Sequence, residues 1–297
     1  MLANDIVCLA MAPLLIEVCV RRGLIPLPYL LALACASNVG SAATLIGNPQ
    51  NMLVAQSLQL SFAGYLVDGA PPAVLGLAIT WLIIRSQWRD RWHADAEVRL
   101  DRRKPPPFDA WQTAKGLVVV TLTVLIFLFT AWPREVVALT AAGVLLLSRR
   151  TASREMIGLV DWHLLVLFIG LFVLNEAVDR AGVLARLYAG LRAAGVDLAN
   201  PAWLFAVTPI VGNLVSNVPG VMLLLPASSG PLAGPTLALA STFAGNLIIV
   251  GSIANIIVVE EAARQGVAID WRAHARVGVP VTLATLAIAA AWLWLRA

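Results

Sequence analysis

Charged side chains are scarce in this chain: they make up 13% of its 297 residues, whereas hydrophobic residues make up 60%. A soluble domain carries about 25% charged residues, so the composition excludes one and indicates a protein of the lipid bilayer. The length accommodates roughly eight to ten crossing or re-entrant elements at about 20 residues each. A net charge of +4, spread over loops between apolar runs, gives no footprint for a nucleic-acid partner.

Cysteine and histidine are equally scarce. The three cysteines, Cys8, Cys19 and Cys35, lie in apolar stretches without CxxC spacing, which favours a packing role over a metal or redox role. The three histidines stand far apart, at positions 93, 163 and 274, and no HExxH motif or pair of acids occurs in the apolar runs. These absences argue against an enzyme and against a bound cofactor.

Two apolar stretches, 33–54 and 237–258, resemble each other at an offset of 204 residues. Each is interrupted once by glycine and small residues, as Gly-Asn-Pro-Gln-Asn at 47–51 and as Gly-Ser-Ile-Ala-Asn at 251–255. A helix that breaks inside a bilayer exposes peptide groups that lipid cannot satisfy. Duplicated broken helices are typical of transporters built from inverted repeats.

A third unusual stretch, 201–226, is apolar at both ends and polar in its middle. Each arm has about 12 residues, or roughly 18 Å of helix, whereas the hydrocarbon core is roughly 30 Å thick. The pattern therefore predicts a re-entrant hairpin with its tip at 212–220. The alternative is one kinked span of 26 residues, bent at Pro209 and Pro219.

These features predict an all-α polytopic membrane protein with two repeats. The predicted order is a remnant of the first repeat at 1–84 (hairpin tip, broken helix 29–60, span 62–84), a basic linker at 85–115, and a complete second repeat at 116–297 (scaffold spans, an interfacial amphipathic helix, the hairpin 201–226, a broken helix 235–263 and a last span). Along this path sixteen Lys and Arg residues fall on the side of the linker and five on the other. The positive-inside rule then predicts an inner (plasma) membrane protein with a cytoplasmic linker and its C-terminus outside.

Asn217 and Pro226 align with Asn4 and Pro13 at an offset of 213, so the chain begins at the tip of a first hairpin. Residues 116–216 precede the second tip, and nothing comparable precedes the first. We therefore expect an N-terminally truncated form of an inverted-repeat transporter of roughly 400 residues. A fragment without activity is the alternative.

Four polar segments are predicted to meet near the middle of the membrane. Peptide N–H groups at half-helix N-termini bind anions, and asparagine side chains and unwound carbonyl groups coordinate cations. The candidate binding residues are Asn4, Asp5, Gly47, Asn48, Asn51, Ser216, Asn217, Gly251, Ser252 and Asn255. Na⁺ is a candidate ligand of Asn4, Asn48, Asn217 and Ser252. The alternative role for each asparagine is a helix cap or an inter-helix hydrogen bond.

The segments 37–40, 47–51 and 216–219, together with Asn4-Asp5, resemble the ion transporter superfamily, which includes citrate-type permeases, the arsenite-pump membrane subunit and divalent-anion sodium symporters. The resemblance covers most of the chain. It implies a scaffold domain and a transport domain that moves as a body to give alternating access, and a possible homodimer.

The expected function is secondary active transport of a small anion, a citrate-like carboxylate, coupled to Na⁺ or H⁺. The expected partners are that substrate and the bilayer. Arsenite efflux and Na⁺/H⁺ antiport are alternatives within the superfamily. A channel is an alternative of another class, because Asn48-Pro49-Gln50 resembles the Asn-Pro tips of water channels; the second copy at 252–254 lacks this motif.

Overall fold

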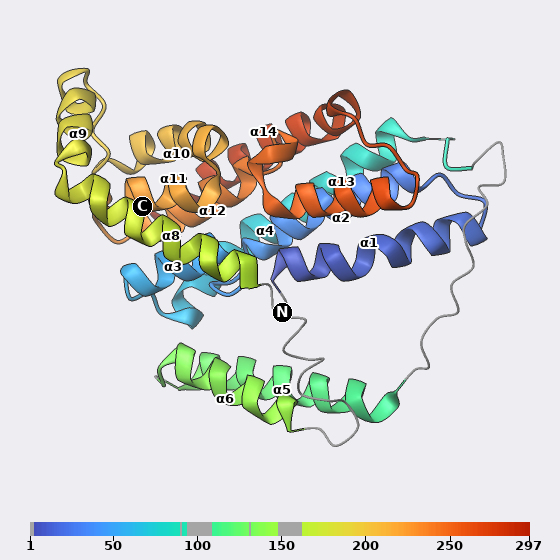
Figure 1. The fold of residues 1–297 in the computed structure, drawn as a ribbon. Helices are drawn as coiled ribbons and strands as arrows, with labels where there is room; N and C mark the ends of the chain where they lie inside the picture. The colour runs from blue at the N-terminus through green and yellow to red at the C-terminus, as the bar shows by residue number, and fades with distance from the viewer. Residues whose placement is uncertain (1–2, 90, 94–108, 131, 148–161) are drawn as a thin grey trace. The chain divides into compact units, whose positions relative to one another are not determined.

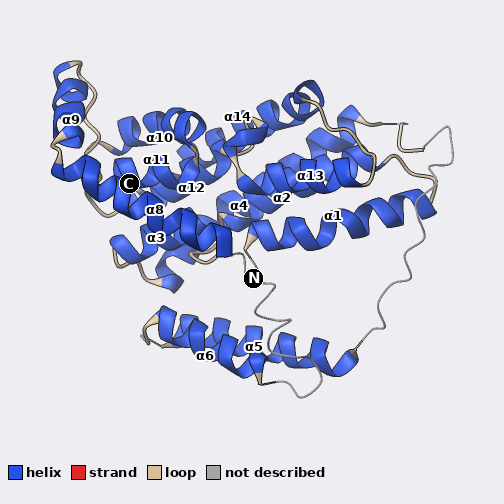
Figure 2. Ribbon diagram, in the orientation of Figure 1, coloured by secondary structure: helices blue, strands red, loops and turns tan. Residues whose placement is uncertain are grey.

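The computed structural model describes residues 3–89, 91–93, 109–130, 132–147 and 162–297. These residues are mostly helical (Figures 1 and 2), and among them the β pairing consists of one isolated bridge between Leu24 and His93. The structure therefore confirms the all-α class. Residues 94–108 of the basic linker and the loop with Arg149, Arg150 and Arg154 lie outside the described residues.

The chain forms two compact units. The first comprises residues 102–178, with α5 (Ala110–Phe129), α6 (Arg134–Leu146) and most of α8 (Trp162–Arg180). Lys115, near the start of α5, donates hydrogen bonds to the carbonyl oxygens of Leu145 and Leu147 at 3.2 Å each. The ammonium group thus lies at the negative C-terminal end of α6, and α5 and α6 are antiparallel.

The second unit comprises residues 2–101 and 179–297. Its helices are α1 (Asn4–Arg21), α2 (Pro26–Ser41), α3 (Pro49–Ser57), α4 (Phe62–Gln87), α9 (Val183–Ala193), α10 (Pro201–Val215), α11 (Asn217–Leu224), α12 (Ala233–Ala244), α13 (Ile253–Arg264) and α14 (Trp271–Arg296). By length and composition, three described helices can cross a membrane: α4, α5 and α14.

Both predicted broken helices are present, as α2 with α3 and as α12 with α13. The chain leaves helical geometry at 42–48, here called the first break, and at 245–252, the second break, which contains a short 3₁₀ turn. The first interruption was expected at 47–51, but Pro49 already begins α3. Asn48 caps this helix and proline is favoured at its first position, so residues 49–51 belong to the helix.

Residues 201–226 form a hairpin, because α10 and α11 fold back on each other. A Cβ atom added to Gly220 would lie 3.0 Å from the Cα atom of Gly212. In one continuous helix these residues would be about 12 Å apart. The reversal occurs at Ser216, whose φ of 75° and ψ of 157° lie in a region that is almost restricted to glycine.

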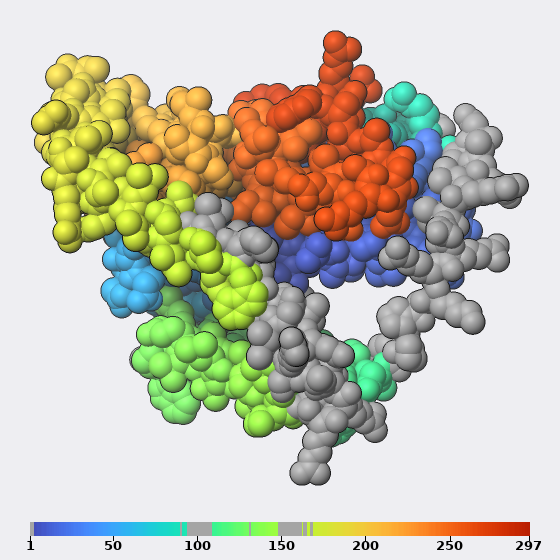
Figure 3. Space-filling model, viewed as in Figure 1, coloured from blue at the N-terminus to red at the C-terminus, as the bar shows by residue number. Residues whose placement is uncertain are grey.

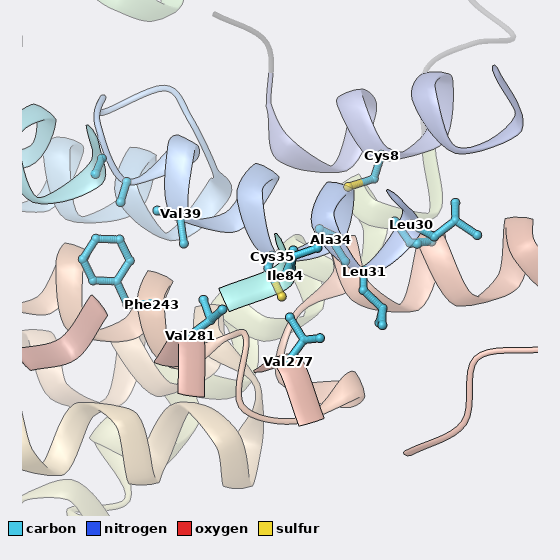
Figure 4. Packing of buried hydrophobic residues seen from close by; sticks show 14 of the residues in the cluster. Cys8, Leu30, Leu31, Ala34, Cys35, Val39, Ile84, Phe243, Val277 and Val281 are labelled. Atoms are coloured by element: carbon cyan, nitrogen blue, oxygen red, sulfur yellow. The ribbon is translucent and has the colours of Figure 1, made fainter. Parts of the chain in front are cut away.

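The core of the second unit surrounds α2. Helices α1, α4, α13 and α14 all pack against it, and Figure 4 shows buried side chains of several of these helices, including Cys8, Cys35 and Val281. Helix α13 also packs against α1, as Figure 3 shows from outside. All three cysteines are buried and free, which agrees with a packing role.

Helices α4 and α14 are also copies of each other, at an offset of 209, and our reading of the sequence missed this. Each has 26 residues. Ser61 caps α4 by accepting from the Gly64 N–H, and the equivalent Asp270 caps α14 by accepting from the Ala273 N–H. Both helices then share a Gly-x-Pro segment (69–71 and 278–280) and a Leu-Ala-Ile segment (77–79 and 286–288).

The two copies are antiparallel and are joined at both ends. Gln87, at the end of α4, donates to the carbonyl oxygen of Arg276 at 2.7 Å. Arg296, which is equivalent to Gln87, donates to Asp68 at 3.0 Å. Equivalent residues thus join the two helices at opposite ends, through partners that are one position apart in the alignment, as expected for two repeats related by a pseudo-two-fold axis.

Candidate functional site

Asn51 and Asn255, which follow the two breaks, bond peptide carbonyl groups at the ends of the preceding helices. Asn51 Nδ2 donates to the carbonyl oxygens of Ser41 at 3.5 Å and Thr44 at 3.0 Å. Asn255 Nδ2 donates to the carbonyl oxygens of Gly245 at 2.7 Å and Ile248 at 3.2 Å, which are the equivalent positions at an offset of 204. A helix C-terminus leaves such carbonyl groups without partners, so each asparagine satisfies the end of the helix before its own break.

The two breaks are also joined crosswise. Asn38, on α2 before the first break, donates to Asn255 Oδ1 at 3.0 Å and accepts from Ser252 Oγ at 2.9 Å, beyond the second break. The equivalent residue of α12 is Thr242, which donates to Asn51 Oδ1 at 3.2 Å and accepts from Asn48 Nδ2 at 3.1 Å. Each repeat therefore holds the start of the other repeat's second half-helix.

Asn38 is the centre of this network. It also donates to Asn246 Oδ1 at 2.9 Å and accepts from Asn4 Nδ2 at 2.9 Å. Its own exposure is 2%. Four hydrogen bonds thus connect this side chain to α1 and to three positions in and after the second break.

The start of α1 and the tip of the hairpin both lie at the network. Asn4, the first residue of α1, bonds Asn38, and its N–H donates to the carbonyl oxygen of Gly47 at 3.0 Å. At the hairpin tip, Asn217 lies beside Gly245, where an added Cβ atom would lie 2.8 Å from Asn217 Nδ2 and 3.2 Å from Ser252 Cβ. Asn4 and Asn217 are both buried, and the Oδ1 atom of each has no hydrogen-bond partner among the described residues.

Four helices begin at this cluster and three end in it. The N-termini are those of α1, α3, α11 and α13, and the C-termini are those of α2, α10 and α12. N-termini carry positive partial charge and C-termini carry negative partial charge. In the part of the chain that the structure describes, the buried polar side chains include no Lys or Arg, and the one buried acid is Asp5, in the first turn of α1.

The ten predicted site residues gather at the start of α1, at the hairpin tip and at the breaks, although their contacts differ. The amides of Asn51 and Asn255 are bonded to peptide carbonyl groups, and Asn48 Oδ1 caps α3. Gly47 and Gly251 allow close contact: an added Cβ atom would lie 2.0 Å from Ser41 O in the first case and 2.7 Å from Asn213 Oδ1 in the second.

A cavity of about 420 Å³ lies elsewhere in the second unit. It is lined by residues of α9, its following loop and the end of the hairpin, among them Tyr188, Arg192, Asp197 and Pro226. None of the ten predicted residues lines it. The asparagines among the ten are buried, with exposures of 0–5%, so they form a packed polar cluster.

Our reading of the sequence missed Thr242 and His274, and named Asn38 only as part of a motif. Asn38 and Thr242 are equivalent at an offset of 204 but differ in type, so a search for identical residues passes over them. The role of both residues depends on hydrogen bonds to residues about 200 positions away, and no local sequence pattern predicts such contacts.

The known proteins that resemble this chain include several named as transporters. The citrate transporter family matches residues 1–244. An uncharacterized transporter of Mycobacterium tuberculosis is 31% identical over the whole of this chain and 74% of its own length, and a 46 kDa membrane protein of Mycobacterium leprae is 29% identical over the same shares. A silicon efflux transporter of Oryza sativa subsp. japonica is 26% identical over 96% of this chain and 74% of its own length.

Proposed function

The chain belongs to the citrate transporter family, and we propose that it moves a small carboxylate anion across the membrane by secondary active transport coupled to Na⁺ or H⁺. The observation that carries the proposal is the convergence of four helix N-termini on one buried cluster of asparagine and hydroxyl side chains. Peptide N–H groups at such termini are ready donors to an anion.

The anion would be held without a fixed positive side chain. No Lys or Arg is among the buried polar residues that the structure describes, so helix dipoles, hydroxyl groups and a co-bound cation would supply the attraction. This arrangement makes anion binding depend on the coupling ion. It is the linkage that a symporter needs, because an ion that improves substrate binding is itself bound better in the substrate's presence.

The two tips are the best candidates for the coupling cation. Asn4 and Asn217 each keep a buried carbonyl oxygen, Oδ1, without a hydrogen-bond partner among the described residues. A hard cation prefers oxygen ligands of this kind. Asn48 and Ser252 are the other two candidates for Na⁺, and both already make hydrogen bonds. Asn48 Nδ2 donates to Ser41 Oγ and Thr242 Oγ1, and Ser252 Oγ donates to Asn38 Oδ1. The geometry therefore favours Asn4 and Asn217.

The crosswise hydrogen bonds support alternating access by a rigid body. Asn38 and Thr242 tie each half-helix start to the other repeat, so both breaks would move together. We place this movement in the plasma membrane, with the linker on the cytoplasmic side and the C-terminus outside, and with a homodimer as the expected assembly.

Efflux of an uncharged oxyacid is the second candidate, in place of carboxylate transport. The cluster's buried side chains are mostly neutral donors and acceptors, which suit arsenous or silicic acid, and one relative is named a silicon efflux transporter. Na⁺/H⁺ antiport is less favoured, because Asp5 is the one buried acid among the described residues. A channel is less favoured still, since the crosswise bonds close the cluster.

Uptake into proteoliposomes tests the proposal. The purified chain would be given labelled citrate, succinate, arsenite or silicic acid, each with an imposed Na⁺ or pH gradient. We expect carboxylate uptake that requires one of the two gradients, loss of this uptake in Asn217→Ala, and retention in Gln56→Ala, which removes an exposed amide from α3. Uptake of arsenite or silicic acid alone would establish the second candidate. Uptake of none of the four would refute transport of these substrates by this chain.

A further inference from the structure

In each break, one peptide carbonyl group contacts a side chain from the last helix of the same repeat. Tyr65 of α4 donates its hydroxyl hydrogen to the carbonyl oxygen of Ala42, with an O–O distance of 2.8 Å. His274 of α14 places Nε2 at 3.1 Å from the carbonyl oxygen of Asn246. Ala42 and Asn246 are equivalent at an offset of 204, and Tyr65 and His274 are equivalent at an offset of 209.

The glycine one turn later makes the same approach in both repeats. A Cβ atom added to Gly69 would lie 2.7 Å from the carbonyl oxygen of Ala42, and one added to Gly278 would lie 2.2 Å from that of Asn246. The helix backbone therefore passes directly over the carbonyl group in each case. A tyrosine in one repeat and a histidine in the other thus occupy the same place and meet the same atom.

We propose that Tyr65 and His274 are paired positioning residues, each holding its break by donating a hydrogen bond to the equivalent peptide carbonyl, and that His274 does so as the tautomer with hydrogen on Nε2. A carbonyl oxygen only accepts hydrogen bonds. A ring with hydrogen on Nδ1 alone would direct the lone pair of Nε2 at that oxygen. The exposure of His274 is 1%, so water cannot compensate for such a contact.

Both positioning residues are connected to the site. Tyr65 Oη also accepts from Asn51 Nδ2 at 3.3 Å. Asn246, whose carbonyl oxygen His274 meets, accepts from Asn38 through its side chain at 2.9 Å. Loss of either donor would release the backbone of a break that carries the network, and so would change transport without contact with the substrate.

The tautomer can be measured directly. The chain has three histidines, so in a His93→Gln, His163→Gln background a ¹⁵N-labelled ring signal belongs to His274. Solid-state NMR of this protein in lipid at neutral pH should show one protonated ring nitrogen, assigned to Nε2. A neutral ring protonated on Nδ1 would overturn the proposal. This measurement does not depend on which solute the protein carries.

A transport series tests the positioning role and rests on the proposed function. His274→Leu should lower the uptake rate by about tenfold, through loss of one buried hydrogen bond, whereas His274→Gln restores an N–H donor and should stay within about threefold of the native rate. Thr285→Val is the matched control: it is buried on α14 and loses bonds within its own helix, so it should keep the native rate.

The two arms separate the possible failures. If the native chain takes up none of the four solutes, the proposed function fails while the NMR result still decides the tautomer. If His274→Leu transports at the native rate, or if His274→Gln is as impaired as His274→Leu although both elute as folded protein, the positioning role is refuted.

Discussion

Replacement of Asn38 by alanine is the sharpest test of the network. The side chain makes four hydrogen bonds of 2.9–3.0 Å, to Asn4, Asn246, Asn255 and Ser252. A buried polar group that loses its partner costs about 1–3 kcal/mol. Some of the four groups can pair again after relaxation, so we expect a total loss of about 4 kcal/mol. At roughly 2–4 °C per kcal/mol, the unfolding midpoint should fall by about 8–16 °C.

Thermal unfolding of the purified protein, followed by the fluorescence of its ten tryptophans, measures this change. Ser37→Ala is the matched control on the same helix: Ser37 contacts Cys8 and the Ala34 carbonyl group, and its loss should cost about 1 kcal/mol. Asn38→Asp should be no more stable than Asn38→Ala, because a carboxylate would face the oxygens of Asn246 and Asn255. The reasoning is wrong if Asn38→Ala unfolds within about 2 °C of Ser37→Ala.

Three further predictions use the same unfolding measurement. Gly278→Ala should lower the free energy of unfolding by about 1–3 kcal/mol, since its methyl group would lie 2.2 Å from a carbonyl oxygen. Gly143→Ala is the control: its methyl group meets nothing within 4 Å, so the substitution should raise the free energy of unfolding by about 0.5–1 kcal/mol. Equal effects of the two substitutions would contradict this prediction. Arg296→Ala should cost less than about 1 kcal/mol, because its pairing with Asp68 is partly exposed, and a loss above about 2 kcal/mol would show that the pair is more than a surface contact. Ser216→Gly should gain about 1 kcal/mol by removing the strained backbone at the second tip, and a destabilised variant would mean that contacts of the hydroxyl outweigh the strain.

The breaks and the hairpin were predictable because their causes are local. Glycine, proline and asparagine at 47–51 determine where α3 begins, through a cap at Asn48 and the fixed φ of Pro49. The arms of the hairpin were predicted from their length alone. Caps also determine where helices begin: α14 begins at Trp271, because Asp270 caps it.

The duplication of α4 in α14 was not predictable from the same alignment. The register is 204 through the breaks and 209 in the last helices, so the second repeat has five additional residues between Val258 and Asp270. An ungapped comparison therefore ends at Val258. In the structure the equivalence follows from contacts instead, since Tyr65 and His274 meet equivalent carbonyl groups.

The structure also separates two roles that one residue type can fill. Asparagine offers both a donor and an acceptor, so the sequence alone could not distinguish a ligand-binding asparagine from one that closes a helix end. Asn51 and Asn255, the most conspicuous duplicated pair, have their amides bonded to backbone. Among the described residues, the Oδ1 atoms of Asn4 and Asn217 have no hydrogen-bond partner. Duplication alone therefore does not distinguish the two roles, because both pairs are duplicated and only the contacts differ.

The four converging N-termini are not equivalent as donors to an anion. Pro49 at the start of α3 has no N–H group, and the N–H of Asn51 already donates to Asn48 Oδ1. Asp5 places a negative side chain in the first turn of α1. Helix α13 begins without proline, acid or side-chain cap, since Ser252 donates its hydroxyl hydrogen to Asn38 instead. Because an anion needs N–H groups that no side chain has neutralised, we expect the substrate to lie nearer to the second break than to the first.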